Sequence, residues 1–169
     1  MKKGQNLIIE ENVTIGKNCT FGHNVVIHEG TIIGDNVVIA DNTVLGKKPF
    51  KSATSATTSE KEHPPLEIGN NTKIGAGCIL YCGCKIGKDC FLGDMASVRE
   101  DVTIGEKTVI GKSVTVENKC TIGCYVKIET NAYITAISTI EDHCFIAPMV
   151  TFSNDNYLGR TEERKKHFK

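Results

Sequence analysis

Residues 68–91 read IGNNTK-IGAGCI-LYCGCK-IGKDCF, four units of six residues that each begin with Ile or Leu. Units of this kind start at residue 9, break off at 46–67, and continue from residue 68 to the unit FSNDNY at 152. The first residue of all 22 units is Ile, Leu, Val or Phe, and Gly follows it in 11 of them. A short fixed period is typical of repeat architectures, in which each unit packs on its neighbours.

The units predict an all-β fold, a parallel β-helix. Three units form one triangular coil, and successive coils stack at the strand spacing of about 4.8 Å. Each unit supplies a large apolar residue at its first position and a small or β-branched residue at its fifth, and these fill the interior. Residues one coil apart then lie in columns. The period does not fix the handedness of the coils, since parallel crossovers are normally right-handed.

The eight cysteines follow the same period. Six of them occupy the fifth position, where other units carry Val, Thr, Ala or Ser: Cys19, Cys78, Cys84, Cys90, Cys120 and Cys144. Cysteine in such a position behaves as a small core residue, which favours free thiols over a metal cluster or a disulfide framework. We therefore expect no bound metal. Cys82 and Cys124 stand at the third position, and we expect their side chains to point outward.

The net charge of the chain and its lack of long apolar runs indicate which partners and which location to expect. The chain has 169 residues, 20 basic and 20 acidic, so no overall field attracts nucleic acid or an anionic membrane. No run approaches the ~20 apolar residues of a membrane-spanning helix, and no apolar stretch follows the two lysines at the start. We expect a cytoplasmic protein with one domain over residues 1–169, and neither nucleic acid nor membrane as a partner.

One long insertion and a charged end depart from the repeat. Leu45 and Ile68 are 23 residues apart, which is not a multiple of six, so residues 46–67 are expected to leave the helix as a loop. A loop of this length is either decoration or a functional segment that reaches over a neighbouring surface. Residues 157–169 form a charged tail or the start of another loop.

The hexad pattern over 9–156, apart from the insertion, resembles the hexapeptide-repeat acyltransferases, which implies left-handed coils. The stretches LGDMASVRED at 92–101 and KIETNAYITAISTIEDHCFIAPMVTFSNDNYLGR at 127–160 resemble the nucleotide-sugar N-acyltransferases. This resemblance implies transfer of an acyl group, expected to be acetyl, from acyl-CoA to the amino group of a UDP- or dTDP-linked aminodeoxy sugar. It also implies a homotrimer with clefts between subunits.

The resemblance implies roles for individual residues. Asn131 corresponds to a residue close to the sugar amine and the CoA sulfur, and Asp94 and Glu100 would recognise or deprotonate the sugar ammonium. Asn154 and Asp155 would line the acyl-CoA end. We assign substrate binding to four neighbours of these residues: Arg99, Glu129, Tyr133 and His143. The family usually continues with a loop and further coils after this point, which puts the CoA contacts in question more than the acceptor contacts.

The columns divide these candidates. Asp94 and Asn131 are predicted to share one face, two coils or about 10 Å apart. Arg99 and Glu100 fall on a second face with Asn154 and Asp155, so a complete site requires an interface between subunits. Asn131 could also be a turn residue, because several units carry Asn at the same fourth position. Asp94 and Glu100 could be solvated surface charges.

Three other functions remain open. Attack by an amine on a thioester requires a modest base, whereas an alcohol requires a positioned histidine, so a sugar O-acetyltransferase would depend on His143. His63 falls in the polar loop and His167 in the tail. A carbonic-anhydrase-like zinc site requires three converging histidines, and His143 is the only one between Pro64 and Arg160. A non-catalytic or ice-binding solenoid requires a regular outward array, which the mixed outward residues do not provide.

Overall fold

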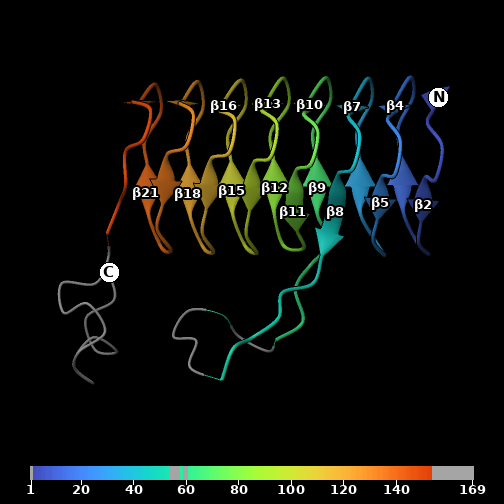
Figure 1. The fold of residues 1–169 in the computed structure, drawn as a ribbon, viewed down its shortest axis with the longest axis horizontal. Coiled ribbons are helices and arrows are strands. Elements are labelled where there is room, and N and C mark those ends of the chain that lie inside the picture. Colours follow the sequence, from blue (N-terminus) through green and yellow to red (C-terminus); the bar gives the residue numbers. More distant parts are fainter. Residues whose placement is uncertain (1, 54–57, 59–60, 154–169) are drawn as a thin grey trace.

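The structure is a computed structural model that describes residues 2–53, 58 and 61–153. These residues wind into a left-handed parallel β-helix, which confirms the predicted fold class (Figure 1). Every strand pairs in parallel with the strand one coil further along, and the strands form three sheets. No helix long and apolar enough to span a bilayer occurs in the part of the chain described.

The three sheets take every third strand. The first has eight strands: β1 (Lys2–Lys3), β4 (Thr20–Phe21), β7 (Val38–Ile39), β10 (Lys73–Ile74), β13 (Phe91–Leu92), β16 (Val109–Ile110), β19 (Lys127–Ile128) and β22 (Phe145–Ile146). The second has seven: β2 (Ile8–Ile9), β5 (Val26–Ile27), β8 (Val44–Lys47), β11 (Ile79–Tyr81), β14 (Ser97–Val98), β17 (Thr115–Val116) and β20 (Tyr133–Ile134). The third also has seven: β3 (Thr14–Ile15), β6 (Ile32–Ile33), β9 (Glu67–Ile68), β12 (Lys85–Ile86), β15 (Thr103–Ile104), β18 (Thr121–Ile122) and β21 (Thr139–Ile140).

The first residue of most units ends a strand and faces the interior. Ile27, Leu80 and Ile110 are completely buried there, and the same column continues through the middle coils. The end coils are less covered: Ile9 in the first coil keeps 38% of its surface exposed, and Ile146 in the last described coil is half-buried. The repeat thus encodes a continuous apolar core that is less covered at its ends.

The fourth position of each unit makes the corner between sheets. The backbone there is left-handed, with φ of 59° at Asn12, 60° at Asn131 and 61° at His143. Asn tolerates this conformation better than most residues, which explains its recurrence at that position. Successive asparagines also form side-chain ladders, as in the 2.9 Å bond from Asn6 Nδ2 to Asn24 Oδ1.

The fifth-position cysteines are core residues, as predicted. Cys78 and Cys84 are fully buried, and burial raises the pKa of their thiols to about 11 and about 12. Cys144 lies in the last coil and is half-buried. Cys82 lies outside the helix core and lines the cavity at its corner, in line with an outward side chain, but it is only 8% exposed because the two limbs of the long loop cover that corner. Cys124 is half-exposed.

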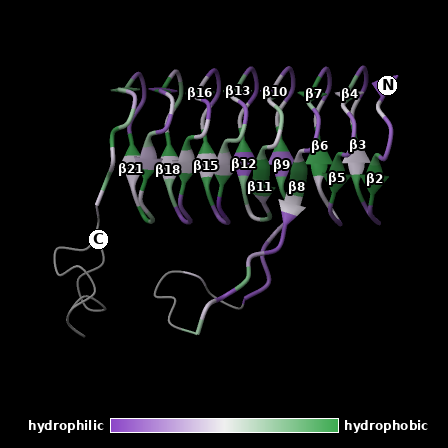
Figure 2. Ribbon diagram, in the orientation of Figure 1, coloured by the Kyte–Doolittle hydropathy of each residue, from purple (hydrophilic) through white to green (hydrophobic). Residues whose placement is uncertain are grey.

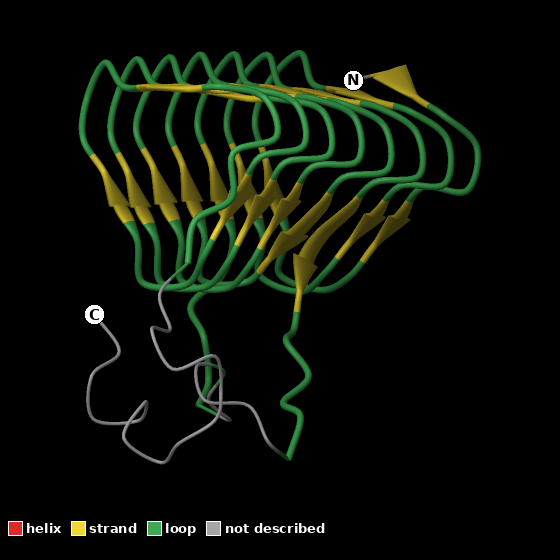
Figure 3. Cartoon of the chain, turned by 60° about the vertical axis from the view of Figure 1, so that its left-hand side comes forward, coloured by secondary structure: helices red, strands yellow, loops and turns green. Residues whose placement is uncertain are grey.

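The long loop joins β8 to β9 and comprises residues 48–66. Val44 and Leu45 pair directly with Ile79 and Leu80, so the coil stack continues beneath the loop. The described limbs are mainly hydrophilic and project from one edge of the triangular helix (Figures 2 and 3). The described limbs therefore lie over part of one row of corners.

Candidate active site beneath the extruded loop

The loop docks on the row of corners that follow the second sheet, which we call the loop edge and define as residues 81–83, 99–101 and 117–119. The outgoing limb (48–53) begins where Lys47 O accepts a hydrogen bond from Cys82 N–H at 3.0 Å. The returning limb (58 and 61–66) is fixed where Pro64 O accepts one from Gly83 N–H at 2.6 Å. Two consecutive backbone groups of one corner thus hold both limbs.

His63 on the returning limb and Asp101 on the loop edge form a largely buried pair. His63 Nδ1 lies 2.9 Å from Asp101 Oδ1, and only 3% of the histidine side chain is exposed. A carboxylate can only accept a hydrogen bond, so Nδ1 of His63 is the donor. Nε2 is buried and has no hydrogen-bond partner among the described residues. This arrangement of base and orienting acid is typical of acyl-transfer sites.

Lys61 completes the surroundings of Asp101. Its Nζ lies 2.9 Å from Asp101 Oδ2. Burial acts to raise the pKa of Asp101, but the contacts with His63 and Lys61 outweigh it, and the pKa is lowered from its ordinary value. Asp101 is therefore ionised at neutral pH and available to orient the imidazole.

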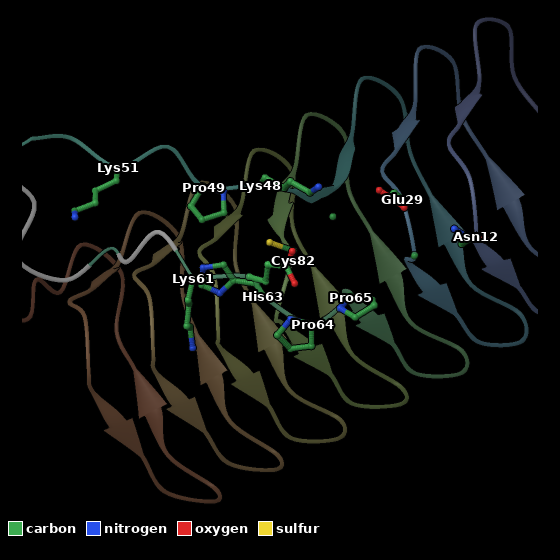
Figure 4. A pocket seen from close by; sticks show the side chains of 13 residues that line it. Asn12, Glu29, Lys48, Pro49, Lys51, Lys61, His63, Pro64, Pro65 and Cys82 are labelled. Carbon is green, nitrogen blue, oxygen red and sulfur yellow. The ribbon is translucent and has the colours of Figure 1, made fainter.

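A cavity of about 560 Å³ lies between the limbs and the helix, within the size range of small-molecule sites. In Figure 4, Lys48 and Pro49 lie on one side of it, His63, Pro64 and Pro65 on the other, and Cys82 between them. Its wall consists of Asn12, Glu29, Gly30, Gly46, Lys48, Pro49, Lys51, Lys61, Glu62, His63, Pro64, Pro65 and Cys82. Lys48 and Lys51 carry positive charge on this wall, Glu29 and Glu62 carry negative charge, and Lys61 is paired with Asp101.

A second polar cluster, centred on Glu100, lies beside Asp101 in the loop edge. Glu100, 1% exposed, accepts hydrogen bonds from Arg99 Nε at 2.9 Å and from Asn118 Nδ2 at 3.0 Å. Burial acts to raise the pKa of Glu100, but Arg99 and Asn118 prevail, and the pKa is lowered. Arg99 also stacks over the Tyr81 ring at 5.0 Å and bonds to the hydroxyl of Thr58 in the returning limb at 3.2 Å. The predicted site residues Arg99 and Glu100 thus lie beside the cavity and brace its loop.

Asp94, Glu129 and Asn131 lie on a different row of corners, which we call the first edge and define as residues 75–77, 93–95, 111–113 and 129–131. Ser113 N–H bonds to Asp94 O, and Asn131 N–H bonds to Lys112 O, so Asp94 and Asn131 are two coils apart. The side chain of Asp94 accepts the Ala76 N–H at 2.9 Å, a structural role that Asp35 and Asp142 repeat elsewhere. Asn131 is exposed and occupies a turn position.

The remaining predicted residues are dispersed. His143 stands on the third row of corners, where its ring stacks on Tyr125 with centroids 5.0 Å apart. Tyr133 projects outward from β20 and is 37% exposed, and burial and the nearby Glu117 raise its pKa. Asn154 and Asp155 lie outside the described residues. A single chain therefore brings Arg99 and Glu100 together, and separates them from Asp94 and Asn131.

Sequence analysis missed His63 because it assigned that residue to a polar loop. A weak signal was present. Pro64 and Pro65 follow His63 directly and restrict the chain just before the repeat resumes at Ile68, which fixes the returning limb against the helix. The partner of His63 could not be inferred, because Asp101 is 38 residues away along the chain.

Comparison with known proteins places these features in context. The family described as bacterial transferase hexapeptide (six repeats) matches residues 12–47, 65–100 and 83–118, more than half of the chain. A candidate acetyltransferase from Bacillus cereus is 25% identical, with a TM-score of 0.54 over 75% of this chain and 70% of that one. A search of curated proteins found no match.

Two further solved structures are similar at lower TM-scores. UDP-N-acetylglucosamine O-acyltransferase from Moraxella catarrhalis is 20% identical, with a TM-score of 0.46, over 80% of this chain and 67% of that one. A mutant GDP-perosamine N-acetyltransferase from Caulobacter crescentus, bound to CoA and GDP-perosamine, is 15% identical, with a TM-score of 0.49. The match covers 86% of this chain, which spans about half (52%) of the Caulobacter protein.

Proposed function

Because the chain belongs to the bacterial transferase hexapeptide family, we propose that it is an acyltransferase with acyl-CoA as donor and a sugar as acceptor. The preferred acceptor is the amino group of a UDP- or dTDP-linked aminodeoxy sugar, and the preferred acyl group is acetyl. The resemblance of residues 92–101 and 127–160 to nucleotide-sugar N-acyltransferases supports this choice. The similarity to the Bacillus cereus candidate acetyltransferase also supports it.

The observation that carries the proposal is the His63–Asp101 pair at the wall of the cavity. In the reaction, the acceptor nitrogen attacks the thioester carbonyl, a C–N bond forms and the C–S bond breaks. His63 Nε2 takes the proton that the nitrogen must lose and returns it to the departing CoA sulfur, while Asp101 holds Nδ1–H and stabilises the imidazolium. Nε2 is buried in this conformation, so the returning limb has to shift before substrate can reach it.

The cavity suits phosphorylated substrates. Lys48, Lys51 and Lys61 line it, and each can bind a phosphate oxygen of the nucleotide or of CoA. Asn131 and Asp94 would enter the same site from the first edge of a neighbouring subunit in a homotrimer. The trimer, the roles of Asn131, Asp94 and Glu100, and the cytoplasmic location are part of the proposal.

A second candidate function is O-acylation of a sugar hydroxyl. The specific observation in its favour is again His63, because an alcohol is far less acidic than an ammonium and depends more on a positioned imidazole. His63 takes the place that sequence analysis gave to His143 in this alternative.

One experiment separates the two candidates. Purified protein is incubated with acetyl-CoA and a panel of UDP- and dTDP-aminosugars, each beside the same nucleotide sugar with hydroxyl in place of amino. Mass spectrometry identifies the acylated product, and alkaline hydroxylamine distinguishes an ester, which it cleaves, from an amide, which resists it. Amide products alone support N-acylation, and ester products alone support the second candidate.

A variant then links the activity to the site. His63→Ala should lower kcat/KM by a factor of about 10² to 10⁴, the usual contribution of a general base. Full activity of His63→Ala would contradict the proposed site, and absence of acyl transfer to every sugar would contradict the proposed function.

A further inference from the structure

Asp101 has two partners of different character. His63 and Lys61 both line the cavity, but His63, which binds Oδ1, is 3% exposed, whereas Lys61, which binds Oδ2, is 55% exposed. The Lys61 ammonium is exposed enough for water or a ligand anion to compete for it, although Asp101 Oδ2 itself is buried. One partner of the carboxylate is therefore fixed, and the other can leave.

We propose that Lys61 is a positioning residue that couples the binding of a diphosphate group in the cavity to the His63–Asp101 pair. This inference rests on the function proposed above. An incoming diphosphate carries more negative charge than one carboxylate, so it draws Nζ of Lys61 away from Asp101 Oδ2. Asp101 then serves His63 alone, and its full negative charge makes Nε2 a stronger proton acceptor.

The charges around the pair favour this exchange. Lys48 and Lys51 line the cavity from the outgoing limb and would bind the same diphosphate. Glu62 on the returning limb and Glu29 from an earlier coil also line the cavity and limit the excess of positive charge. Cys82 is a neutral thiol there, since burial raises its pKa. Glu100 is neutralised by Arg99 and does not compete for Lys61.

The exchange has a consequence for substrate choice. A substrate without phosphate leaves Lys61 on Asp101, and the base stays weak. A substrate with a diphosphate moves Lys61 and strengthens the base. The enzyme would thus discriminate in kcat as well as in affinity, by means of a lysine that does not touch the reacting atoms.

The kinetic test uses Lys61→Met, with Lys85→Met as the control. Lys85 forms an ion pair of similar exposure with Glu67 at 3.1 Å, outside the cavity wall. A diphosphate could come from either substrate, so two pairs are compared: a nucleotide aminosugar against its methyl glycoside, and acetyl-CoA against S-acetylpantetheine. The substrate pair whose kinetic constants change in Lys61→Met identifies which of the two diphosphates binds Lys61.

Lys61→Met should raise KM for the diphosphate substrate about tenfold and raise kcat for its phosphate-free counterpart about threefold. The increase in kcat is the decisive sign, because loss of a merely structural contact would lower it. Lys85→Met should change neither constant. A kcat for the phosphate-free substrate that stays equal to wild type or falls in Lys61→Met would overturn the inference.

A second measurement does not depend on activity. Inorganic pyrophosphate is titrated into the protein while the ring signals of His63 are followed by NMR. The signals should shift in wild type and in Lys85→Met, and the shift should be at least about threefold smaller in Lys61→Met. Equal shifts in all three proteins, or none in wild type, would refute the coupling. If the coupling is present but no sugar is acylated, the proposed function fails and the coupling stands.

Discussion

Gly83 and Asp101 lie one coil apart, and the carboxylate of Asp101 occupies the space that a side chain on Gly83 would need. An ideal Cβ on Gly83 would stand 2.5 Å from Asp101 Oδ1, the oxygen that holds His63. Gly83 also has a left-handed backbone, with φ of 77°. The absent side chain therefore makes room for the pair that we propose as the catalytic base and its orienting acid.

Gly83→Ala should displace Asp101 and reduce kcat/KM about tenfold or more. The matched control is Gly77→Ala, where φ is 68° but a Cβ would meet only Met95 Cγ at an ordinary 3.6 Å. Both variants should lose about 1–2 kcal/mol of unfolding free energy, the cost of Ala in this backbone conformation. Equal activity of the two variants in steady-state assays would contradict the role of Gly83.

Glu100→Gln should alter the pH dependence of stability. The pKa of Glu100 in the folded protein is below its ordinary value of 4.5, so its contribution is present above that value and is lost as the pH falls below it. The variant should be about 1–3 kcal/mol less stable near neutral pH, because a buried charged partner of Arg99 is removed. It should also lose less stability than wild type on acidification.

Urea unfolding at neutral and acidic pH measures both effects. Glu106→Gln is the control, since Glu106 forms an exposed ion pair with Lys88 at 3.1 Å and such pairs contribute little. A neutral-pH loss as small as that of Glu106→Gln would show that Glu100 does not brace the loop edge.

Asn131→Ala should lower kcat/KM about 10²-fold, or about 2.7 kcal/mol of transition-state stabilisation, if Asn131 serves the acceptor. Ser113→Ala is the control, because Ser113 occupies the same corner column one coil earlier, with φ of 55°.

Asp94→Asn keeps the oxygen that accepts the Ala76 N–H, so it should fold normally and weaken acceptance of the ammonium form. His143→Ala should retain a substantial fraction of activity. The reverse ranking of these variants would move the site away from the first edge.

Cys124 and Cys144 should react with a thiol reagent before Cys82. The first two are half-buried, whereas Cys82 is covered by the loop limbs and burial raises its pKa. Mass spectrometry of peptides after brief labelling gives the order. Cys82 reacting first would show that the loop does not cover its corner in solution. Elemental analysis of the same sample tests the expectation of no stoichiometric zinc.

The protein should be a homotrimer in solution. The candidate residues divide between the loop edge and the first edge of one chain, so a complete site requires residues from a neighbour. Light scattering or sedimentation equilibrium measures the mass. A stable monomer with full transferase activity would eliminate the shared site.

The repeat predicted the fold because it is local: each unit carries its own strand, corner and core residue. The same rule placed six cysteines in the core and set Asp94 and Asn131 two coils apart. It could not predict that Cys82 is buried or that His63 packs on the helix, because the rule describes only the coils and not the loop that covers this corner. Whether His63 meets Asp101 depends on how an irregular segment docks, and no periodicity encodes that contact.

The direct pairing of β8 with β11 separates the loop from the scaffold that carries it. Since the chain leaves and rejoins the stack at neighbouring points, the length of segment 48–66 has no bearing on the register of the coils. Insertions, deletions or complete exchange of this segment would leave the hydrophobic core of the helix intact and would change the side chains that line the cavity at the loop edge. Such an enzyme can diversify by module replacement, and grafting a relative's segment between Lys47 and Glu67 offers a direct route to a new acceptor.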